Sequence, residues 1–556
     1  MILKTYIKAV AELFNTVLNK VYKIENSNFV IDKNKNIDNG DFFTNIAMLS
    51  AKPLKKNPIE IASEIIEAIK DEKQYLVTNL QVAKPGYINF DVHPLYKQRL
   101  LNLILKEKSG FGQFAPKDIF YNIEFVSANP TGLLHIGHAR NAALGATLAN
   151  VWQKYGIRVE KEYLVNDAGN QINTLGIAVL IRYMQLFNKD IELPQDSYHA
   201  SEIIDVAKQL KDEYGDIFLN LEIKDNKVND NDALELIKDF AVEKMLDLIK
   251  KDLALLRISF DLFYSERDSY KNNLIPQTLK RIEKYSYTKD GATWLRTTDF
   301  GDDKDRVMVK SDGTFTYFLP DIVYHNIKYT RHNNMTKMFN IWGADHKSYV
   351  DRVTISLKCL GHKDDILHVI ILQMIRLTKN GQEFKMSKRT GNSLTLRDLV
   401  NTIGVDSARW VLVSQTAATQ IEIDVDKFNK QTHDNNLYYV LYAYARICQL
   451  LNKVNFEADC QVNWNLLTNP KEKELINNLI FYPTVIESIS SSYEANKLNN
   501  FLFQLSQVLH SYYNEIKIKD EKDLELKKAR CALFACVKDT IKSGLHLLDI
   551  EPSEKI

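Results

Sequence analysis

The sequence IFYNIEFVSANPTGLLHIGH, residues 119–138, decides the fold of this chain. Residues 119–125 are mostly apolar and aromatic, which is typical of a buried strand. Turn-forming residues follow at 127–132, and a helical pattern then runs over about 135–155. A second strand-like segment, 159–165, comes next. This order of strand, loop, helix and strand predicts a parallel sheet and an α/β fold.

Two histidines begin the predicted helix. His135 and His138 are three residues apart, so on a first helical turn they project from one face. They would lie at the carboxyl end of the sheet, where open α/β folds bind ligands, and at a helix N-terminus, which attracts anions. Gly137 leaves room for a flat base, and two imidazole donors can stabilise charge on a transferring phosphoryl group. An isolated pair with this spacing is more often a surface or capping pair.

A second segment, KMSKR at 385–389, follows about 250 residues later in a polar loop that contains Gly381 and Gly391. Lys385, Lys388 and Arg389 bring three cations into five residues, which suits an arm that closes over pyrophosphate. Basic loops are common, so the segment gains its meaning from the histidine pair. The chain has no Walker A pattern, and a P-loop ATPase is therefore not indicated.

The pattern along the chain divides it into three regions. Residues 1–112 combine helical patterns at 2–22 and 57–70 with a strand-like segment at 87–92. Residues 113–400 contain the α/β region, with a charged helical insertion over about 173–300. Further strand-like segments of this region lie at 306–309, 338–342 and 368–372. Residues 401–556 have helical periodicity at 437–451, 474–489, 499–516 and 527–548, which predicts a helical bundle.

Composition excludes several classes of protein. The chain has 556 residues, enough for three or four domains at about 150 residues each, and its net charge is only +1. Any RNA-binding surface must therefore be a local patch. The five cysteines form no C-x-x-C pair and no zinc spacing, so we expect reduced thiols, no protein metal site and a cytoplasmic location. No stretch of about 18 apolar residues indicates a membrane span.

Together, HIGH and KMSKR resemble the two signature motifs of class I aminoacyl-tRNA synthetases, the first letter for letter and the second with Arg389 in the last position. The surrounding residues are similar to the bacterial arginyl-tRNA synthetase family over essentially the whole chain. The matching segments are 40–42, 57–58, 85–90, 124–140, 165–172, 316–322, 343–346, 373–374 and 438–446. Departures from the family pattern are Leu133, Asn141, Lys347 and Ile556, and none of them removes a proposed catalytic group.

The resemblance implies an architecture and an activity. It implies a Rossmann-type catalytic domain at 113–400, an additional N-terminal α+β domain that contacts tRNA at 1–112, and a helical stem-contact and anticodon-binding domain at 401–556. The implied reaction joins L-arginine to ATP as arginyl-adenylate and transfers arginine to the 3′-terminal adenosine of tRNA(Arg), with release of AMP and pyrophosphate. Mg²⁺ would come with ATP, and the first step would require bound tRNA. We expect a monomer.

The resemblance also assigns roles to residues. His135, His138, Lys385 and Lys388 would be catalytic and would bind ATP together with Gly137 and Met386. Asp321 and Glu124 would bind the guanidinium with Tyr317 beside them, Asn129 would hold the α-amino group, and Asp345 would assist. A guanidinium offers five donors in a planar fork that a carboxylate grips in bidentate fashion, which the ammonium of lysine cannot match. Asn166 and Gln171 either line the pocket for arginine and the tRNA end or belong to an ordinary turn.

Recognition of tRNA is expected in the helical region, where unstacked anticodon bases would meet aromatic side chains. The candidates are Tyr438, Tyr439, Tyr442 and Tyr444, and core packing is the better interpretation for at least half of them. Arg446 would contact phosphate or cap a helix.

Three other hypotheses stay open at this point. They are a class I synthetase for another amino acid, a nucleotidyltransferase that does not use tRNA, and an inactive RNA-binding relative. The lack of zinc-type cysteines disfavours some synthetases of the first kind, and the long C-terminal helical region disfavours the second. The intact histidine and lysine motifs disfavour the third.

Overall fold

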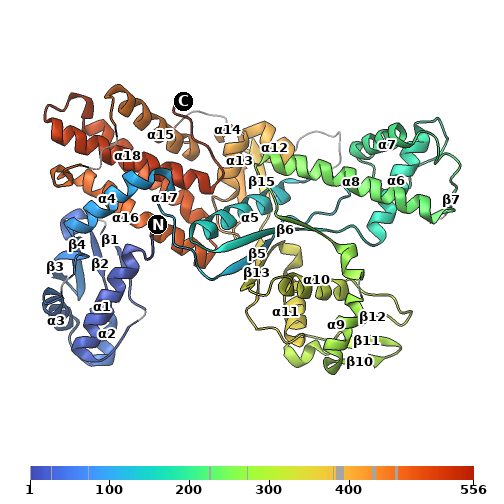
Figure 1. The fold of residues 1–556 in the computed structure, drawn as a ribbon, viewed down its shortest axis with the longest axis horizontal. Coiled ribbons are helices and arrows are strands. Elements are labelled where there is room, and N and C mark those ends of the chain that lie inside the picture. The colour runs from blue at the N-terminus through green and yellow to red at the C-terminus, as the bar shows by residue number, and fades with distance from the viewer. Residues whose placement is uncertain are drawn as a thin grey trace. The chain divides into compact units, whose positions relative to one another are not determined.

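The computed structural model describes residues 2–26, 28–34, 36–72, 74–224, 227–271, 273–379, 381–383, 394–428, 432, 434–457 and 461–555. Contacts within the chain divide it into two compact units (Figure 1). Unit 1 comprises 1–117, 150–156 and 430–556, and unit 2 comprises 118–149 and 157–429. Each unit is described separately below.

The centre of unit 2 is a five-stranded sheet in which every pair of neighbours is parallel, with the order β14-β13-β5-β6-β9. The strands are β5 (Phe120–Glu124), β6 (Arg158–Val165), β9 (Leu262–Ser265), β13 (Lys337–Gly343) and β14 (Leu367–Leu372). Two strands extend from β5 on one side and two on the other, so the strand order reverses between β5 and β13. In such sheets ligands bind beyond the carboxyl ends of the strands at this reversal. The parallel sheet predicted from the sequence is confirmed.

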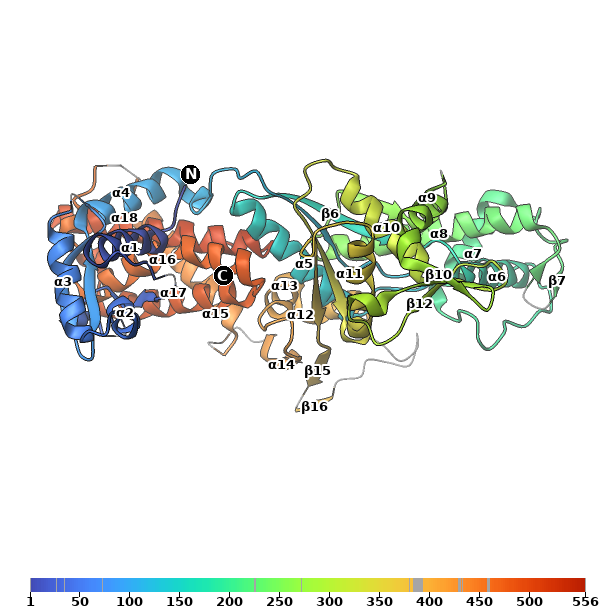
Figure 2. The ribbon, with the colours of Figure 1, turned by 90° about the horizontal axis from the view of Figure 1, so that it is seen from below.

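Helices connect these strands. They are α5 (Ile136–Lys154), α6 (Asn170–Gln185), α7 (Ser201–Tyr214), α8 (Asn231–Leu255), α9 (Leu274–Ile282), α10 (Phe318–Thr330) and α11 (Val350–Cys359). Helices α6, α7 and α8 pack on one another beside a small hairpin of β7 (Ile223–Lys224) and β8 (Lys227–Val228) (Figure 2).

Two smaller sheets complete unit 2. One is antiparallel, with the order β10-β11-β12, and consists of β10 (Ser286–Lys289), β11 (Ala292–Leu295) and β12 (Arg306–Val309). The other joins β15 (Ile375–Lys379) to β16 (Gln382–Glu383) and β17 (Ile421–Asp424). Between β16 and β17 the chain forms the short helices α12 (Leu396–Ile403) and α13 (Val405–Leu412), and α14 (Val425–Phe428) follows β17.

The prediction for residues 173–300 needs a correction. This segment is not only a helical insertion, because β9 pairs with β6 at the edge of the central sheet and β10 and β11 form strands of their own. The sequence of β9 is Leu-Phe-Tyr-Ser, four residues that are all only partly buried, so it shows neither a long apolar run nor an alternation. The short strand β9 lies between charged helical segments, and the sequence pattern therefore did not identify it.

Unit 1 begins with an α+β region, as predicted. Its sheet is antiparallel with the order β1-β2-β4-β3, built from β1 (Ile31–Lys33), β2 (Phe42–Thr44), β3 (Val77–Ala83) and β4 (Tyr87–Val92). Its helices are α1 (Tyr6–Tyr22), α2 (Ile46–Leu54), α3 (Pro58–Lys70) and α4 (Pro94–Glu107). Asn57 caps α3, whose first residue is proline, and this is a standard helix start.

Four long helices form the C-terminal part of unit 1. They are α15 (Asn436–Lys453), α16 (Pro470–Ser492), α17 (Asn496–Glu515) and α18 (Leu524–Leu547), and they match the four predicted helical ranges. A fully buried carboxylate, Glu472, fastens three of them because it accepts hydrogen bonds from Tyr512 at 2.7 Å and Arg530 at 2.8 Å. The predicted helical bundle is confirmed for these four helices. Its predicted start at 401 is wrong, because 401–429 belong to unit 2 and include strand β17.

Candidate active site

Unit 2 contains a cavity of about 1200 Å³ at the carboxyl ends of the central strands. Its walls include residues that end β5, β6, β13 and β14, together with the first turns of α5 and α10. This is the place where the strand order reverses, so the fold itself predicts a ligand here. The predicted site residues among its lining are Glu124, Asn129, His135, Gly137, His138, Asn166, Asp321 and Asp345.

Helix α5 enters the cavity through a constrained turn. Val126 and Ser127 both have positive φ angles, 67° and 42°, which side-chain-bearing residues rarely adopt. Asn141 supports the turn, since its side chain accepts a hydrogen bond from the Val126 N–H and donates one to the Ile341 carbonyl, both at 2.8 Å. The departure from the family pattern at Asn141 therefore links the ends of β5 and β13.

The two histidines stack on each other with ring centroids 3.7 Å apart. The backbone N–H of His135 donates to Nδ1 of His138 at 3.3 Å, and the N–H of Gly137 donates to Nδ1 of His135 at 3.1 Å. Each Nδ1 is thus an acceptor, which leaves an Nε2–H as the donor of each ring. A side chain at Gly137 would collide with the His135 ring, because a Cβ there would lie 2.8 Å from its Cε1 atom.

Both rings are neutral near pH 7. Burial, with a smaller contribution from His135, lowers the pKa of His138 to about 3, and burial also lowers the pKa of His135. A neutral imidazole can donate a hydrogen bond to an anion without first gaining a proton. The pair therefore presents two N–H donors of fixed tautomer, as a phosphate-binding turn requires.

A carboxylate at the other side of the cavity begins helix α10. The side chain of Asp321 lies in the first turn, and the hydroxyl of Tyr349 donates to its Oδ2 atom at 2.6 Å. Burial raises the pKa of Asp321 to about 7, the Tyr349 hydrogen bond opposes this, and the charges of Glu266 and Glu124 add to it. Carboxylates that crowd one another in this way are suited to a cationic ligand.

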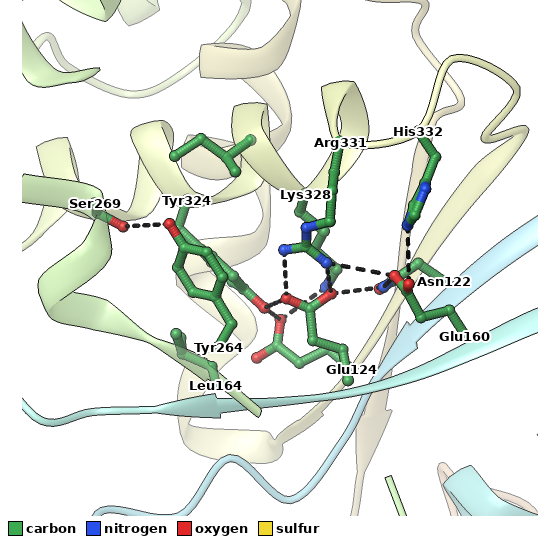
Figure 3. A network of polar contacts seen from close by, with 12 residues as sticks. Asn122, Glu124, Glu160, Leu164, Tyr264, Ser269, Tyr324, Lys328, Arg331 and His332 are labelled. Atoms are coloured by element: carbon green, nitrogen blue, oxygen red, sulfur yellow. Dashed lines mark hydrogen bonds and ion pairs between the residues drawn. The ribbon is translucent and has the colours of Figure 1, made fainter. Parts of the chain in front are cut away.

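Glu124, the last residue of β5, belongs to a buried network that Figure 3 shows. Its Oε2 atom accepts from Lys328 at 2.8 Å and from the Tyr324 hydroxyl at 3.0 Å, and its Oε1 atom accepts from Ser127 at 3.1 Å. Burial tends to raise the pKa of Glu124, but Lys328 and other partners outweigh it and the pKa is lowered. Glu124 is therefore an ionised carboxylate whose charge is already partly balanced.

The same network contains two further glutamates on β6. Glu162 accepts from both terminal nitrogens of Arg331 at 3.0 Å, and Glu160 pairs with His332 at 2.9 Å. The amide of Asn122 donates to Glu160 at 2.9 Å and to Glu162 at 2.6 Å (Figure 3). The network fastens α10, and with it Asp321, onto the central sheet.

The remaining candidates lie as follows. The amide of Asn129 donates to Gln171 at 2.7 Å, and the amide of Asn166 donates to the Ser127 carbonyl at 3.1 Å, so all three adjoin the turn before α5. Asp345 lines the cavity with an exposed side chain. Tyr317 is 78% exposed and is not among the residues that line the cavity. Lys385, Met386 and Lys388 lie outside the described residues.

Sequence reasoning missed three residues of this region. Tyr349 and Glu266 act on Asp321 as stated above, and neither has a local sequence signal. Arg140 is 1% exposed and donates to the backbone carbonyls of Gln373, Thr416 and Thr419 at 2.7 to 2.9 Å. Burial lowers its pKa to about 10. Arg140 thus joins α5 to the chain on either side of β15, and only its position next to His138 could have drawn attention to it.

Aromatic residues of α15 form the candidate anticodon surface. Tyr438 and Tyr442 stack with centroids 6.1 Å apart and are partly exposed, and the Arg446 guanidinium lies 3.7 Å from the ring centre of Tyr513. Tyr444 is 4% exposed and Tyr439 packs against His510. Within the described residues, no group of three His, Cys, Asp or Glu side chains could hold a metal, and no helix could cross a membrane.

Three family models match consecutive parts of the chain. They are the arginyl tRNA synthetase N terminal domain at 8–92, the catalytic domain of class I tRNA synthetases (R) at 100–434, and the DALR anticodon binding domain at 440–556. The chain belongs to the arginyl-tRNA synthetase family. It is an aminoacyl-tRNA ligase of class I, and the sequence-based prediction of family and fold is confirmed.

Similar proteins extend over the full length of this synthetase. An arginine–tRNA ligase of Malacoplasma penetrans is 51% identical over 558 residues, which cover 99% of each chain. One from Ureaplasma parvum is 43% identical and covers 98% of this chain and 99% of its own. The solved arginyl-tRNA synthetase of Thermus thermophilus has a TM-score of 0.77, covers 99% of this chain and all of its own, and at 18% identity supports the fold.

Proposed function

We propose that this synthetase activates L-arginine with ATP and transfers it to the 3′-terminal adenosine of tRNA(Arg), releasing AMP and pyrophosphate. The observation that carries the proposal is the pairing of two elements at one cavity. Neutral histidine donors lie at the start of α5, and the carboxylates Asp321 and Glu124 lie across from them. The first element suits phosphate and the second suits a guanidinium.

In the first step, an oxygen of the arginine carboxylate attacks the α-phosphorus of ATP, and the bond to pyrophosphate breaks. The carboxylate is already ionised, so this step needs no general base. The Nε2–H groups of His135 and His138 would donate to the α-phosphate as negative charge develops there. Lys385 and Lys388, by their motif, would receive the departing pyrophosphate.

The amino acid must be held while this happens. Asp321 would take the guanidinium by its carboxylate, with Glu124, and Glu266 would add negative charge nearby. Asn129 would hold the α-amino group, while Tyr317, Asp345, Asn166 and Gln171 would complete the site as the family pattern implies. Mg²⁺ would arrive with ATP and neutralise phosphate charge.

In the second step, the 2′-hydroxyl oxygen of the terminal ribose attacks the carbonyl carbon of the adenylate, the bond to phosphate breaks, and AMP leaves with the electron pair. The hydroxyl proton passes to a phosphate oxygen of the departing AMP. The C-terminal helices would read the anticodon with exposed aromatic residues such as Tyr438 and Tyr442. The N-terminal domain would contact the tRNA elbow. A monomer in the cytoplasm is part of the proposal.

One experiment tests the activity directly. The purified protein is incubated with ATP, Mg²⁺, total tRNA and each labelled amino acid in turn. We expect charging with arginine alone. Charging with another amino acid, or no charging with arginine, would overturn the proposal.

A further inference from the structure

The carboxylate of Asp321 is held from one side. Tyr349 donates to Oδ2 at 2.6 Å, and in the part of the chain that the structure describes no other side chain hydrogen bonds to this carboxylate. Both residues line the cavity. A short O–H···O contact of this kind, to an ionisable acceptor, is among the stronger hydrogen bonds in proteins.

The tyrosine is itself firmly placed. It ends the 3₁₀ turn Ala344–Tyr349, which follows β13, and its ring packs edge-on against Phe318 with centroids 6.4 Å apart. The ring centroid of Trp342 lies 6.1 Å from that of Tyr349, and the Arg352 guanidinium lies 5.7 Å from the centre of the Tyr349 ring. Removal of the hydroxyl alone would therefore leave the ring contacts in place.

We propose that Tyr349 is a positioning residue for arginine, because it holds one oxygen of the Asp321 carboxylate and leaves the other free for the guanidinium. This inference rests on the proposed function, in which Asp321 receives the guanidinium. Tyr349 need not touch the substrate. It acts by fixing the direction of the free oxygen and by supplying, among the described residues, the one side-chain hydrogen bond that favours the ionised carboxylate.

The Tyr349 hydrogen bond is important because the other groups around Asp321 do not supply a free positive charge. The groups that face Asp321 are Glu266 before α9, Glu124 on β5 and Tyr270, with His325 one turn later on α10. Lys328 is bound to Glu124, and burial lowers the pKa of His325 to about 4, so neither supplies a free positive charge to Asp321. Burial, and then the charge of Asp321, raises the pKa of Tyr349, so its hydroxyl remains a donor.

The pKa of Asp321 determines how arginine affinity should change with pH. Asp321 has a pKa of about 7 in the free protein and must be ionised to bind a guanidinium, so arginine binding at lower pH must expel a proton. Arginine affinity should be constant above about pH 8 and fall progressively below about pH 7. Without the Tyr349 donor the pKa rises, and the fall begins at a higher pH.

The experiment measures arginine affinity between about pH 6 and pH 9 by calorimetry, with Tyr349→Phe and Tyr329→Phe compared to the unchanged protein. Tyr329 lies on the same α10 helix, packs on His362 outside the cavity and loses the same atom. We expect Tyr349→Phe to raise the pH below which arginine affinity falls by roughly 0.5 to 1 pH unit, and to lower arginine affinity several-fold at about pH 7. ATP affinity should not change, and the control variant Tyr329→Phe should behave like the unchanged protein.

A second measurement does not need the variant. Arginine binding to the unchanged protein at about pH 6.5, in two buffers of different ionisation heat, should release most of one proton. If arginine affinity fell below the same pH in Tyr349→Phe as in the unchanged protein, or if no proton were released, the role of Tyr349 would be overturned. Failure of arginine to bind at any pH would instead overturn the proposed function.

Discussion

At the scale of single residues, Asp321 should decide the choice of amino acid. The variant Asp321→Asn removes the negative charge but keeps nearly the same shape. Loss of one partner of a charge pair costs about 2 to 5 kcal/mol, so arginine affinity should fall by at least about 30-fold. ATP affinity should not change, because the histidine turn is untouched.

The measurement is the affinity for each ligand separately, with Asp351→Asn as the control. Asp351 is an exposed carboxylate on the nearby helix α11 and does not line the cavity. If Asp321→Asn bound arginine as tightly as the unchanged protein, the guanidinium pocket would be misplaced.

His138 offers a matched pair of substitutions. An asparagine amide reaches about as far as Nδ1 of histidine, whereas a glutamine amide reaches about as far as Nε2. Because Nδ1 accepts from the backbone and Nε2–H is the free donor, His138→Gln should retain more activity than His138→Asn. Loss of such a donor lowers kcat by about 10² to 10³.

Single-turnover charging at saturating arginine measures this effect, with His362→Asn as a control outside the cavity. Equal losses in the glutamine and asparagine variants would contradict the assignment of Nε2–H as the donor. Arginine affinity should be the same in all three variants, because none alters the carboxylates.

Residues with a local pattern were predictable, and those without one were not. His135 and His138 belong to one short motif, and Asp321 lies in the segment 316–322 that resembles the family, so local sequence pointed to them. Tyr349 is 28 residues from Asp321, and Arg140 reaches carbonyls more than 200 residues away. These contacts form only when distant segments meet at the folded sheet, and they have no counterpart in local periodicity. Tyr317 is the converse case, since it lies in the same segment but its side chain is exposed.

At the scale of elements, the cavity depends on how α10 lies on the sheet. Asn340, Glu124 and Glu162 are direct neighbours across β13, β5 and β6, which places two carboxylates side by side. Like charges in this arrangement destabilise a sheet. Helix α10 compensates these charges. Lys328 donates to both Glu124 and Asn340, and Arg331, at the end of the helix, donates to Glu162.

The variant Arg331→Met should therefore destabilise unit 2. It leaves the fully buried Glu162 without its cation, and the break of such a pair costs about 3 kcal/mol. Denaturant unfolding measures the loss. The double variant Arg331→Met with Glu162→Gln should recover part of it, because no unpaired charge then remains. An unchanged midpoint in the single variant would show that the pair contributes no stability.

Elements were predictable in proportion to their length and periodicity. The four long C-terminal helices and strands β5, β6, β13 and β14 carry extended apolar patterns, and each was located from the sequence. Strand β9 has four residues and partial burial, and only its parallel pairing with β6 identifies it. Pairing is a long-range property, so a short edge strand gives little local signal.

At the scale of the whole molecule, the two units should respond to different ligands. The cavity and its lining lie within 118–149 and 157–429, whereas the anticodon binding domain model matches 440–556 in unit 1. A ligand stabilises the part of a protein that binds it, by an amount that grows with its concentration relative to Kd. Amide hydrogen exchange resolves this by segment.

We expect arginine with a non-hydrolysable ATP analogue to slow exchange around the turn at 126–138 and the start of α10, and to leave α15 unchanged. A hairpin that carries the anticodon arm of tRNA(Arg) should slow exchange near the exposed end of α15, at Tyr438 and Tyr442, and a hairpin with a scrambled anticodon loop is the control. If the anticodon hairpin instead protected the cavity turn, or neither ligand separated the units, the assignment of the two binding roles would be wrong. The test is informative because the C-terminal tyrosines divide sharply, with Tyr444 buried in the core and Tyr438 and Tyr442 stacked and partly exposed.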